Sequence, residues 1–518
     1  MALPFAENLL MRLNQLCVPA KTQKTFLRMI KLCESLYRTI IRPRLYSIFL
    51  TPFLILILVF SITTSNYCYA RIVHVTVHQE LQNILNTSQD GDELILAAGV
   101  YYGNFVIEHS ITLRGKDGVT IDAQGHGHAL ELKNSNIKLF DLNIIHWGDD
   151  LTNQDAGIYS DEPANNLIIR NNTLHGDGFG MWLQNCEHIQ VINNKVQGNP
   201  KLRSADRGNG IQLSTVKHVL VSGNTIWNTR DGLYIISSQE NLLRENTMHS
   251  LRYGVHYMYS HSNKVIDNLA YNTRAGYALM SSKNLEVRGN ISRDNEDYGF
   301  LLNFITSSFI TNNSIKNIWT KSENKVLGRD GKGLFVYNSA YNTISGNTVD
   351  TAEIGIHLTA GSEHTQVFGN SFINNPMQVK YVSNKKQEWS QNQRGNYWSN
   401  YLGWDMDSNG VGDVMYEPND GIDQLLWRYP EMKILMDSPS IIILRWVQRQ
   451  FPVLKPPGVK DSYPLMQAEA PAKNYLIGPK ETHSNSSSHM NADHKISPYT
   501  NTTHTDNLSH INATWDAS

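Results

Sequence analysis

Cysteine is scarce in this sequence. The chain has 518 residues and four cysteines, Cys17, Cys33, Cys68 and Cys186, so a chain that starts after Ala70 keeps one and can form no intrachain disulfide. A basic excess is also lacking, because 45 Lys and Arg stand against 47 Asp and Glu, and this argues against a nucleic-acid platform. A large chain without disulfides needs an extensive apolar core, which a stacked repeat supplies.

The first 70 residues have the pattern of an export signal. Residues 1–45 are net basic, residues 46–62 form an apolar run, and small residues follow at Cys68 and Ala70. This order is typical of a cleavable secretion signal, here with a long basic leading region. An uncleaved anchor is the alternative, although the run is slightly short for a membrane-spanning helix. In both cases the chain from Arg71 onward is predicted to lie outside the cytoplasmic membrane.

Two residue columns recur with a period near 22. Asn follows a short apolar stretch nine times, with spacings of 22, 30, 22, 22, 22, 23, 34 and 23 residues. Gly followed by an alternating strand recurs in step with it. The Asn column is Asn172, Asn194, Asn224, Asn246, Asn268, Asn290, Asn313, Asn347 and Asn370. Matching periods with matching insertions predict an all-β fold, a right-handed single-stranded parallel β-helix of about a dozen coils with a C-terminal cap containing a short helix.

The position of a residue in these columns predicts its backbone conformation and the direction of its side chain. Residues one and three after each Gly are mostly apolar and are expected to point inward, because side chains alternate faces along a strand. Each column Asn is expected to take the left-handed backbone conformation where one strand bends into the next. Stacked Asn side chains are also expected to hydrogen-bond along the axis.

The repeat divides the chain into segments. Residues 71–384 are predicted to form the β-helix, with a short helix at 78–85 over its first coil. Residues 385–466 form the predicted cap, and residues 467–518, rich in Asn, Ser, Thr and His, are expected to be disordered. Insertions at 197–209 and 319–332 are either part of a binding face or tolerated surface loops.

The positions two after each Gly form an outward column that is unusually aromatic. We expect a ligand or protein partner to cover such a surface. The candidate docking residues in this column are Tyr159, Trp182, Tyr234 and Phe335.

Two methionines in successive coils suggest a metal site. Met258 and Met280 both lie four residues after a column Gly, which places them about 4.8 Å apart across adjacent strands. His256 lies on the same face, and His261 ends the same strand-turn segment. Thioether and imidazole ligands suit Cu(I). Ordinary apolar packing of the methionines is the alternative.

The predicted cap has two further features. Asp405, Asp407, Asn409 and Asp413 resemble a calcium loop, but the position of the bidentate Glu is Tyr416, so a structural Ca²⁺ and a hydrogen-bonded turn both fit. Residues 438–451 predict a helix with Ser438 as N-cap and Pro439 in its first turn. Its apolar residues, among them Leu444 and Trp446, are candidates for docking against the solenoid end or a membrane partner.

Polysaccharide-active enzymes also use parallel β-helices. Glycoside hydrolysis needs two carboxylates across the scissile bond, and the outward columns offer only Asp161. A lyase or epimerase would need a base beside Lys or Arg, and no such cluster stands out in the sequence. An enzyme is therefore the weaker interpretation.

Several stretches resemble the NosD family of periplasmic maturation proteins of nitrous oxide reductase. They include Gly-Asn-Tyr-Trp-Ser-Asn at 395–400, Trp-Asp-Met-Asp-Ser-Asn-Gly-Val-Gly-Asp at 404–413 and Leu-Arg-Trp-Val-Gln-Arg-Gln-Phe-Pro at 444–452. The resemblance covers about residues 71–466. It implies a non-enzymatic periplasmic protein that works with an ABC transporter permease and its ATPase.

That resemblance also implies copper handling during assembly of the copper–sulfur site of the reductase. The expected partners are then the transporter, nitrous oxide reductase itself and a copper chaperone. The cap helix becomes the candidate permease contact. A metal-free scaffold that only docks proteins remains the alternative.

Overall fold

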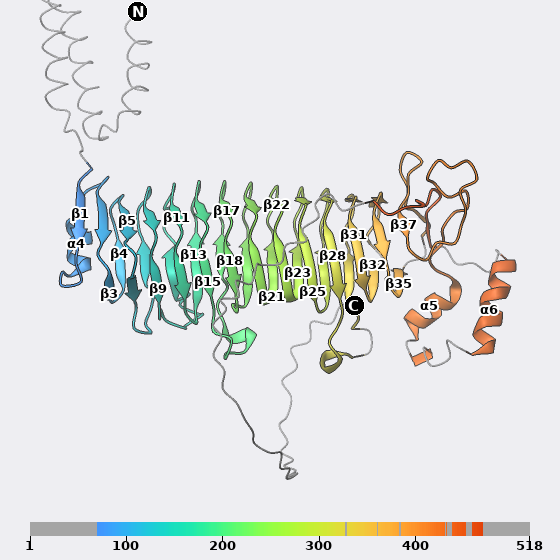
Figure 1. Ribbon diagram of the computed structural model, residues 1–518, viewed down its shortest axis with the longest axis horizontal. Helices are drawn as coiled ribbons and strands as arrows, with labels where there is room; N and C mark the ends of the chain where they lie inside the picture. Colours follow the sequence, from blue (N-terminus) through green and yellow to red (C-terminus); the bar gives the residue numbers. More distant parts are fainter. Residues whose placement is uncertain are drawn as a thin grey trace, which may run out of the picture. The chain divides into compact units, whose positions relative to one another are not determined.

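The computed structural model describes residues 70–326, 329–359, 361–382, 385–429, 431–432, 438–451 and 458–469. The predicted export signal, except Ala70, and the predicted tail beyond residue 469 lie outside the described residues. The described chain winds into stacked coils of short parallel strands, which confirms the predicted fold class (Figure 1).

One sheet takes a single strand from each coil. It has 13 strands, in agreement with the predicted dozen coils. In spatial order the strands are β1 (Ile72–Val75), β2 (Glu93–Leu96), β5 (Thr112–Gly115), β8 (Lys138–Phe140), β11 (Ile168–Arg170), β14 (Gln190–Ile192), β17 (Leu220–Ser222), β20 (Leu242–Arg244), β22 (Lys264–Ile266), β24 (Glu286–Arg288), β27 (Phe309–Thr311), β30 (Thr343–Ser345) and β33 (Gln366–Phe368).

The remaining strands of the coils form a 23-stranded sheet that bends around the core. Its first part contains β3 (Gly99–Tyr102), β4 (Phe105–Ile107), β6 (Val119–Asp122), β7 (Leu130–Leu132), β9 (Asn143–Ile145), β10 (Ala156–Ser160), β12 (Thr173–His175), β13 (Phe179–Gln184), β15 (Lys195–Gln197), β16 (Ile211–Ser214), β18 (Thr225–Trp227) and β19 (Asp231–Ile236). Its second part contains β21 (Thr247–Met258), β23 (Leu269–Met280), β25 (Ile291–Asn295), β26 (Tyr298–Asn303), β28 (Ser314–Ile318), β29 (Lys332–Tyr337), β31 (Thr348–Ala352), β32 (Ile354–Thr359), β34 (Ser371–Ile373), β35 (Met377–Val382) and β37 (Tyr397–Trp398). A separate pair, β36 (Gln387–Glu388) and β38 (Val459–Lys460), belongs to the cap.

The core follows the predicted inward column. The residue after each column Gly pairs with its equivalent in the next coil, the last pairing being with Val379, which follows Gln378, and every member is fully or almost fully buried. The column runs Ile158, Met181, Ile211, Leu233, Val255, Tyr277, Phe300, Leu334, Ile356 and Val379. Burial of apolar area at each level stabilises the stack without a disulfide.

The Asn column forms a continuous hydrogen-bonded ladder. In each step the backbone N–H and side-chain N–H of one Asn donate to the side-chain oxygen of the next, as from Asn246 to Asn268 at 3.0 and 2.9 Å. The ladder continues to Asn396, whose backbone N–H donates to Asp461 at 2.7 Å. The predicted side-chain stacking is thus confirmed.

The predicted left-handed conformation of these Asn residues is wrong. The positive-φ residue is the one before each ladder Asn, for example Asn171 with φ 59° and Asp267 with φ 56°. The bend needs a left-handed residue one position earlier, and the ladder Asn turns its side chain inward to satisfy buried backbone groups.

Helices occur at the two ends of the solenoid. Helix α4 (Leu81–Thr87) buries Leu81 and Leu85 over the first coil, three residues later than the start predicted. Helix α6 (Pro439–Gln450) begins after Ser438, whose Oγ accepts from the N–H of Ile441 at 3.4 Å, as predicted. Helix α5 (Gly421–Arg428), which the sequence analysis did not predict, begins with a capping box between Asp420 and Asp423. None of the described helices is long and apolar enough to cross a membrane.

Both predicted insertions are loops on one edge of the solenoid. Figure 1 shows them projecting downward, in green near residue 200 and in yellow near residue 325. Each contains one short 3-10 turn, Ser204–Asp206 or Ser322–Asn324. The strip between them is formed by strands β19, β21, β23 and β26.

Candidate functional site

The two predicted methionine ligands lie opposite each other. Met258 on β21 and Met280 on β23 are register partners in adjacent parallel strands, and both side chains are half-buried. Strand register therefore brings two thioethers to equivalent outward positions one strand spacing apart.

His256 lies on the same strand as Met258 and is held by a carboxylate. Its Nδ1 is 2.8 Å from Oδ2 of Asp231 on the neighbouring strand β19. Its Nε2 has no hydrogen-bond partner among the described residues, and the ring is 6% exposed. The register partner of His256 on β23 is Ala278, which adds only a methyl group beside the ring.

Tyr234 links the imidazole to the thioether. Its hydroxyl donates to Sδ of Met258 at 3.3 Å, and its ring meets the His256 ring edge-on with centroids 4.6 Å apart. Tyr253 makes a second edge-on contact with His256 at 5.1 Å. The imidazole is thus fixed between two aromatic rings, with Met258 beside it.

His261 is not joined to this group by any contact among the residues described. It follows the turn at Tyr259, where φ is 51°, and its Nδ1 accepts from the backbone N–H of Lys283 at 3.3 Å. Its place in a metal site stays a prediction.

The carboxylate beneath His256 is fully buried and doubly paired. Arg252 donates to both oxygens of Asp231, at 2.8 and 2.6 Å. Burial alone raises the pKa of this carboxyl, but hydrogen bonds and charge from Arg252 and His256 outweigh burial and hold the pKa below its usual value. An ionised Asp231 can only accept, so Nδ1 of His256 carries a proton, and in the neutral imidazole Nε2 is then the nitrogen with the lone pair.

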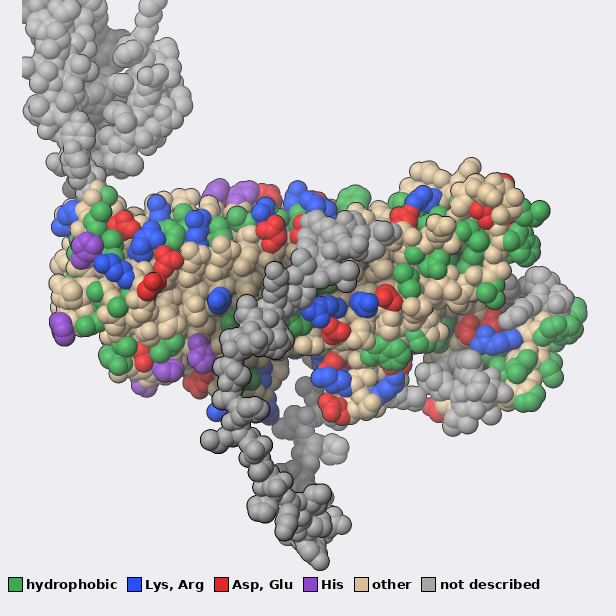
Figure 2. All heavy atoms as spheres, viewed as in Figure 1, with side chains coloured by type: hydrophobic (Ala, Val, Ile, Leu, Met, Phe, Trp, Pro, Cys, Tyr) green, Lys and Arg blue, Asp and Glu red, His purple; other side chains and the backbone are tan. Residues whose placement is uncertain are grey.

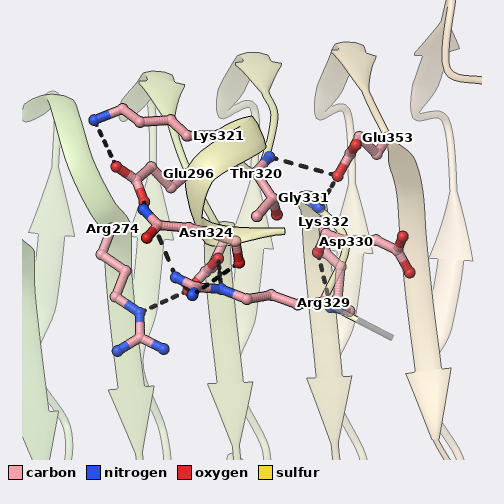
Figure 3. A network of polar contacts seen from close by, with 11 residues as sticks. Arg274, Glu296, Thr320, Lys321, Asn324, Arg329, Asp330, Gly331, Lys332 and Glu353 are labelled. Atoms are coloured by element: carbon pink, nitrogen blue, oxygen red, sulfur yellow. Dashed lines mark hydrogen bonds and ion pairs between the residues drawn. The ribbon is translucent and has the colours of Figure 1, made fainter. Parts of the chain in front are cut away.

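A second buried carboxylate lies further along the strip. Asp297 accepts from Arg274 at 2.6 Å and from Arg329 at 2.9 and 3.0 Å. Arg329 belongs to the 319–332 insertion, so this pairing fastens the loop to the coils (Figure 3).

Two more ion pairs anchor the same loop. Lys321 contacts Glu296 at 2.7 Å, and Lys325 pairs with Glu353, which also accepts from the backbone N–H of Gly331. The insertion is therefore built onto the outward face over the coils that carry β26, β29 and β32.

Asp231 and Arg252 were missed from the sequence. Outward side chains were expected two and four residues after each column Gly, whereas Asp231 lies one residue before Gly232 and Arg252 two residues before Gly254. The conclusion that no base lies beside an Arg is therefore wrong. The recurrence of Arg230, Arg252 and Arg274 at 22-residue spacing was the available signal.

The candidate docking residues differ in exposure. Tyr159 is 7% exposed, packs with Phe179 and stacks on His128 at 3.7 Å. Trp182, Tyr234 and Phe335 are half-buried. Part of the aromatic column is thus already covered by the chain itself.

The cap concentrates exposed apolar side chains. On α6, Ile441 packs against Ile422 of α5, and Arg445 contacts Asp420 and Asp423 at 2.5 and 2.9 Å. The opposite side leaves Ile442, Ile443, Leu444 and Trp446 exposed, at 61, 60, 48 and 60%. Figure 2 shows hydrophobic side chains gathered at this end of the molecule.

The calcium-like loop is held by its own hydrogen bonds. Asp405 accepts from the backbone N–H groups of Asn409 at 3.1 Å and Gly410 at 2.8 Å, and Asp413 accepts from Met406 at 2.7 Å. Asn409 also donates to Asp407 at 2.9 Å. Over the described part of the chain, no three His, Cys, Asp or Glu side chains converge as a metal site. The Ca²⁺ site stays a prediction.

Residues 192–403 match the family model "Periplasmic copper-binding protein (NosD)", and residues 116–229 match "Right handed beta helix region". A Pseudomonas aeruginosa protein named "Probable ABC transporter binding protein NosD" is 53% identical over 384 residues, which cover 74% of this chain and 90% of that protein. A protein of the same name from Stutzerimonas stutzeri is 49% identical over 375 residues, which cover 72% and 86%.

Solved structures share the coil architecture more distantly. "A new PL6 alginate lyase complex with trisaccharide" matches with 15% identity and a TM-score of 0.45, over 62% of this chain and 90% of that chain. The two relatives described above are named as binding proteins, not as enzymes. With about half of its residues identical to theirs across most of their length, this chain belongs to the NosD family.

Proposed function

We propose that this chain is a non-enzymatic periplasmic factor that handles Cu(I) for assembly of the copper–sulfur site of nitrous oxide reductase, together with an ABC transporter. The observation that carries the proposal is the Met258–Met280 register pair with His256 beside it. The copper-binding description of the family and the names of the two relatives support it.

Three side chains would hold the ion. The thioethers of Met258 and Met280 are soft ligands that favour Cu(I), and Nε2 of His256 is the unpartnered lone pair. Asp231 orients that imidazole as carboxylates commonly do behind metal-bound histidines. His261, on the same strand-turn segment, is the candidate fourth ligand.

Partners are assigned to two surfaces. The exposed side of α6, with Leu444 and Trp446, is the proposed contact with the transporter permease, whose ATPase lies on the cytoplasmic side. The half-buried aromatic residues Trp182, Tyr234 and Phe335 are the proposed contact with nitrous oxide reductase or a copper chaperone. The 405–413 loop is retained as a candidate structural Ca²⁺ site.

A Cu(I) competition titration against a colorimetric chelator tests the copper assignment. The full chain would carry Gln in place of the five tail histidines, because these could bind copper themselves. The residues replaced are His483, His489, His494, His504 and His510. In this background, Met258→Leu/Met280→Leu keeps side-chain volume but removes both thioethers.

We expect about one Cu(I) per chain and an affinity loss of about tenfold or more in the double variant. The matched control is Met406→Leu/Met415→Leu, because these methionines are exposed in the cap at 83 and 48%. Failure of the parent chain to compete would overturn the copper assignment and leave a metal-free docking scaffold.

A polysaccharide lyase is the second candidate, because Asp231, His256 and Tyr234 combine an oriented base with a phenol. A two-carboxylate hydrolase is disfavoured, since Asp231 and Asp297 are both buried and paired with arginines. Incubation with alginate and pectate, followed by detection of unsaturated products, separates the candidates. Product formation that His256→Ala abolishes and Met258→Leu/Met280→Leu preserves would favour the lyase.

A further inference from the structure

A second histidine occupies the same outward column as His256 but has a different environment. His357 on β32 is 9% exposed, and neither ring nitrogen has a hydrogen-bond partner among the described residues. Its ring lies 4.8 Å from the ring of Phe335 on one side, and its register partner on the other side is Lys380. A buried ring nitrogen without a hydrogen-bond partner is unfavourable unless a ligand or water completes it.

A buried lysine lies beside it. Lys332, at the start of β29, is 5% exposed, and its Nζ lies 5.2 Å from the ring centroid of Tyr298 and 5.5 Å from that of Phe335. The ammonium donates to the backbone oxygen of Asp330 at 2.8 Å, and no ion pair to it occurs in the described part of the chain. Burial lowers the pKa of Lys332 to about 8, so it is mostly charged at neutral pH.

Two carboxylates near Lys332 form ion pairs with other cations. Asp297 is shared by Arg274 and Arg329, and Glu353 pairs with Lys325 and accepts from backbone N–H groups of the insertion (Figure 3). The charge of Asp330 also raises the pKa of Lys332, but no ion pair joins the two side chains in the described part of the chain, so the ammonium has no carboxylate in direct contact.

The charges around the two histidines have opposite sign. Asp231 contacts His256, which favours a bound cation. Burial first, and then the charges of Lys380 and Lys332, lower the pKa of His357 to about 2. His357 is therefore neutral, keeps one N–H donor, and lies among ammonium groups that repel a metal ion and attract an anion.

We propose that Lys332, His357 and Lys380 form a binding site for a small oxyanion, with residues 329–332 at the end of the insertion as one wall. Sulfate, phosphate and a free carboxylate share the required chemistry, namely several oxygen acceptors and a negative charge. The proposal does not depend on copper binding at Met258 and Met280.

Calorimetric titration of the full chain with sulfate, phosphate and acetate, at matched ionic strength, tests the site. We expect saturable one-site binding of at least one of these anions. Lys332→Met and His357→Gln should each weaken that binding at least about tenfold, because the first removes a charged donor and the second replaces the ring N–H by an amide donor in a different position. Lys316→Met is the matched control, since Lys316 is 64% exposed and pairs with Asp350 at 3.5 Å. This variant should bind the anion as tightly as the parent does.

The melting temperature separates a binding defect from a folding defect. Lys332→Met removes a buried charge, so without added oxyanion it should melt no lower than the parent. Loss of binding with unchanged or higher melting temperature supports the site. Absence of saturable binding by the parent, or equal binding by Lys332→Met or His357→Gln, would overturn it. If Lys332→Met does not fold, the anion affinity of His357→Gln decides: weaker binding supports the site, and binding equal to that of the parent overturns it.

Discussion

Oδ2 of Asp231 lies 2.8 Å from Nδ1 of His256, one coil along the solenoid. The hydrogen bond joins a fully buried carboxylate to an imidazole that is almost as deeply buried, and it leaves Nε2 without a partner. Arg252 keeps Asp231 ionised through two further hydrogen bonds. One carboxylate therefore fixes both the orientation and the tautomer of the candidate copper ligand.

Removing the charge of Asp231 should weaken copper binding. Asp231→Asn keeps the side-chain shape but no longer enforces the Nδ1–H tautomer, so we expect Cu(I) affinity to fall by about tenfold or more in the chelator competition. Asp297→Asn is the matched control, because Asp297 is also buried and bound by arginines but contacts no histidine. Both variants should lose stability, and only the first should lose copper. Equal copper affinity in the two variants would show that Asp231 has no positioning role.

The Asn ladder should contribute strongly to stability. Asn268 donates to Asn290 and to the backbone oxygen of Leu243, and it accepts from Asn246. Asn268→Ala leaves several buried groups unsatisfied, at about 1–3 kcal/mol each, so the free energy of unfolding should fall by about 3 kcal/mol or more. Chemical denaturation measures this loss. The exposed Asn86→Ala on α4 should change stability by less than about 0.5 kcal/mol, and similar losses in both variants would argue against the ladder.

The ladder also shows what the sequence could reveal. Register in a parallel solenoid equals the repeat period, so periodicity alone located the core column and the Met258–Met280 pair. The left-handed bend was misplaced by one residue, because both Asn171 and Asn172 satisfy the sequence preference and only hydrogen bonding distinguishes them.

Pairings that involve the insertions could not be predicted in this way. Arg329 reaches Asp297 across 32 residues through a loop whose path has no periodicity. The environments of His256 and His357 were hidden for a related reason. The outward column gives their positions and their aromatic neighbours, whereas the charged residues Asp231 and Lys332 lie in another column, directly before the column Gly. Helix α5 did have a readable signal, the Asp420–Asp423 capping box, which the sequence analysis overlooked.

His357 should make stability fall in mild acid. Its pKa is lowered to about 2 by burial and by Lys380 and Lys332, whereas an unfolded His titrates near 6.5. Below about pH 6.5 the unfolded chain binds a proton that the folded chain does not, so this contribution is complete above that pH and is lost as the pH falls. Between pH 6.5 and 5 the loss amounts to about 2 kcal/mol.

His357→Gln should remove this part of the pH dependence, as measured by denaturant unfolding at pH 5 and pH 7. His188→Gln is the control for loss of an imidazole, because the His188 side chain is 59% exposed. Its free energy of unfolding should depend on pH as that of the parent does. If the free energy of unfolding of His357→Gln depends on pH as strongly as that of the parent, His357 titrates alike in the folded and unfolded chains.

The exposed side of α6 should bind the transporter without supporting the fold. Ile442 and Trp446 point away from the α5 contact made by Ile441 and Arg445, so Ile442→Ser/Trp446→Ala should leave the melting temperature unchanged. A few side chains, most often Trp, Tyr and Arg, account for most of the binding energy at protein interfaces. We therefore expect the double variant to lose about tenfold or more in affinity for the permease–ATPase complex, measured by binding to the complex in nanodiscs.

Tyr341→Ala, which removes an equally exposed aromatic residue from the solenoid turn at 64% exposure, should bind as the parent does. If the parent and the double variant bind the complex equally well, and both bind it better than empty nanodiscs, this side of the helix does not contact the permease and the transporter is recognised elsewhere on the chain.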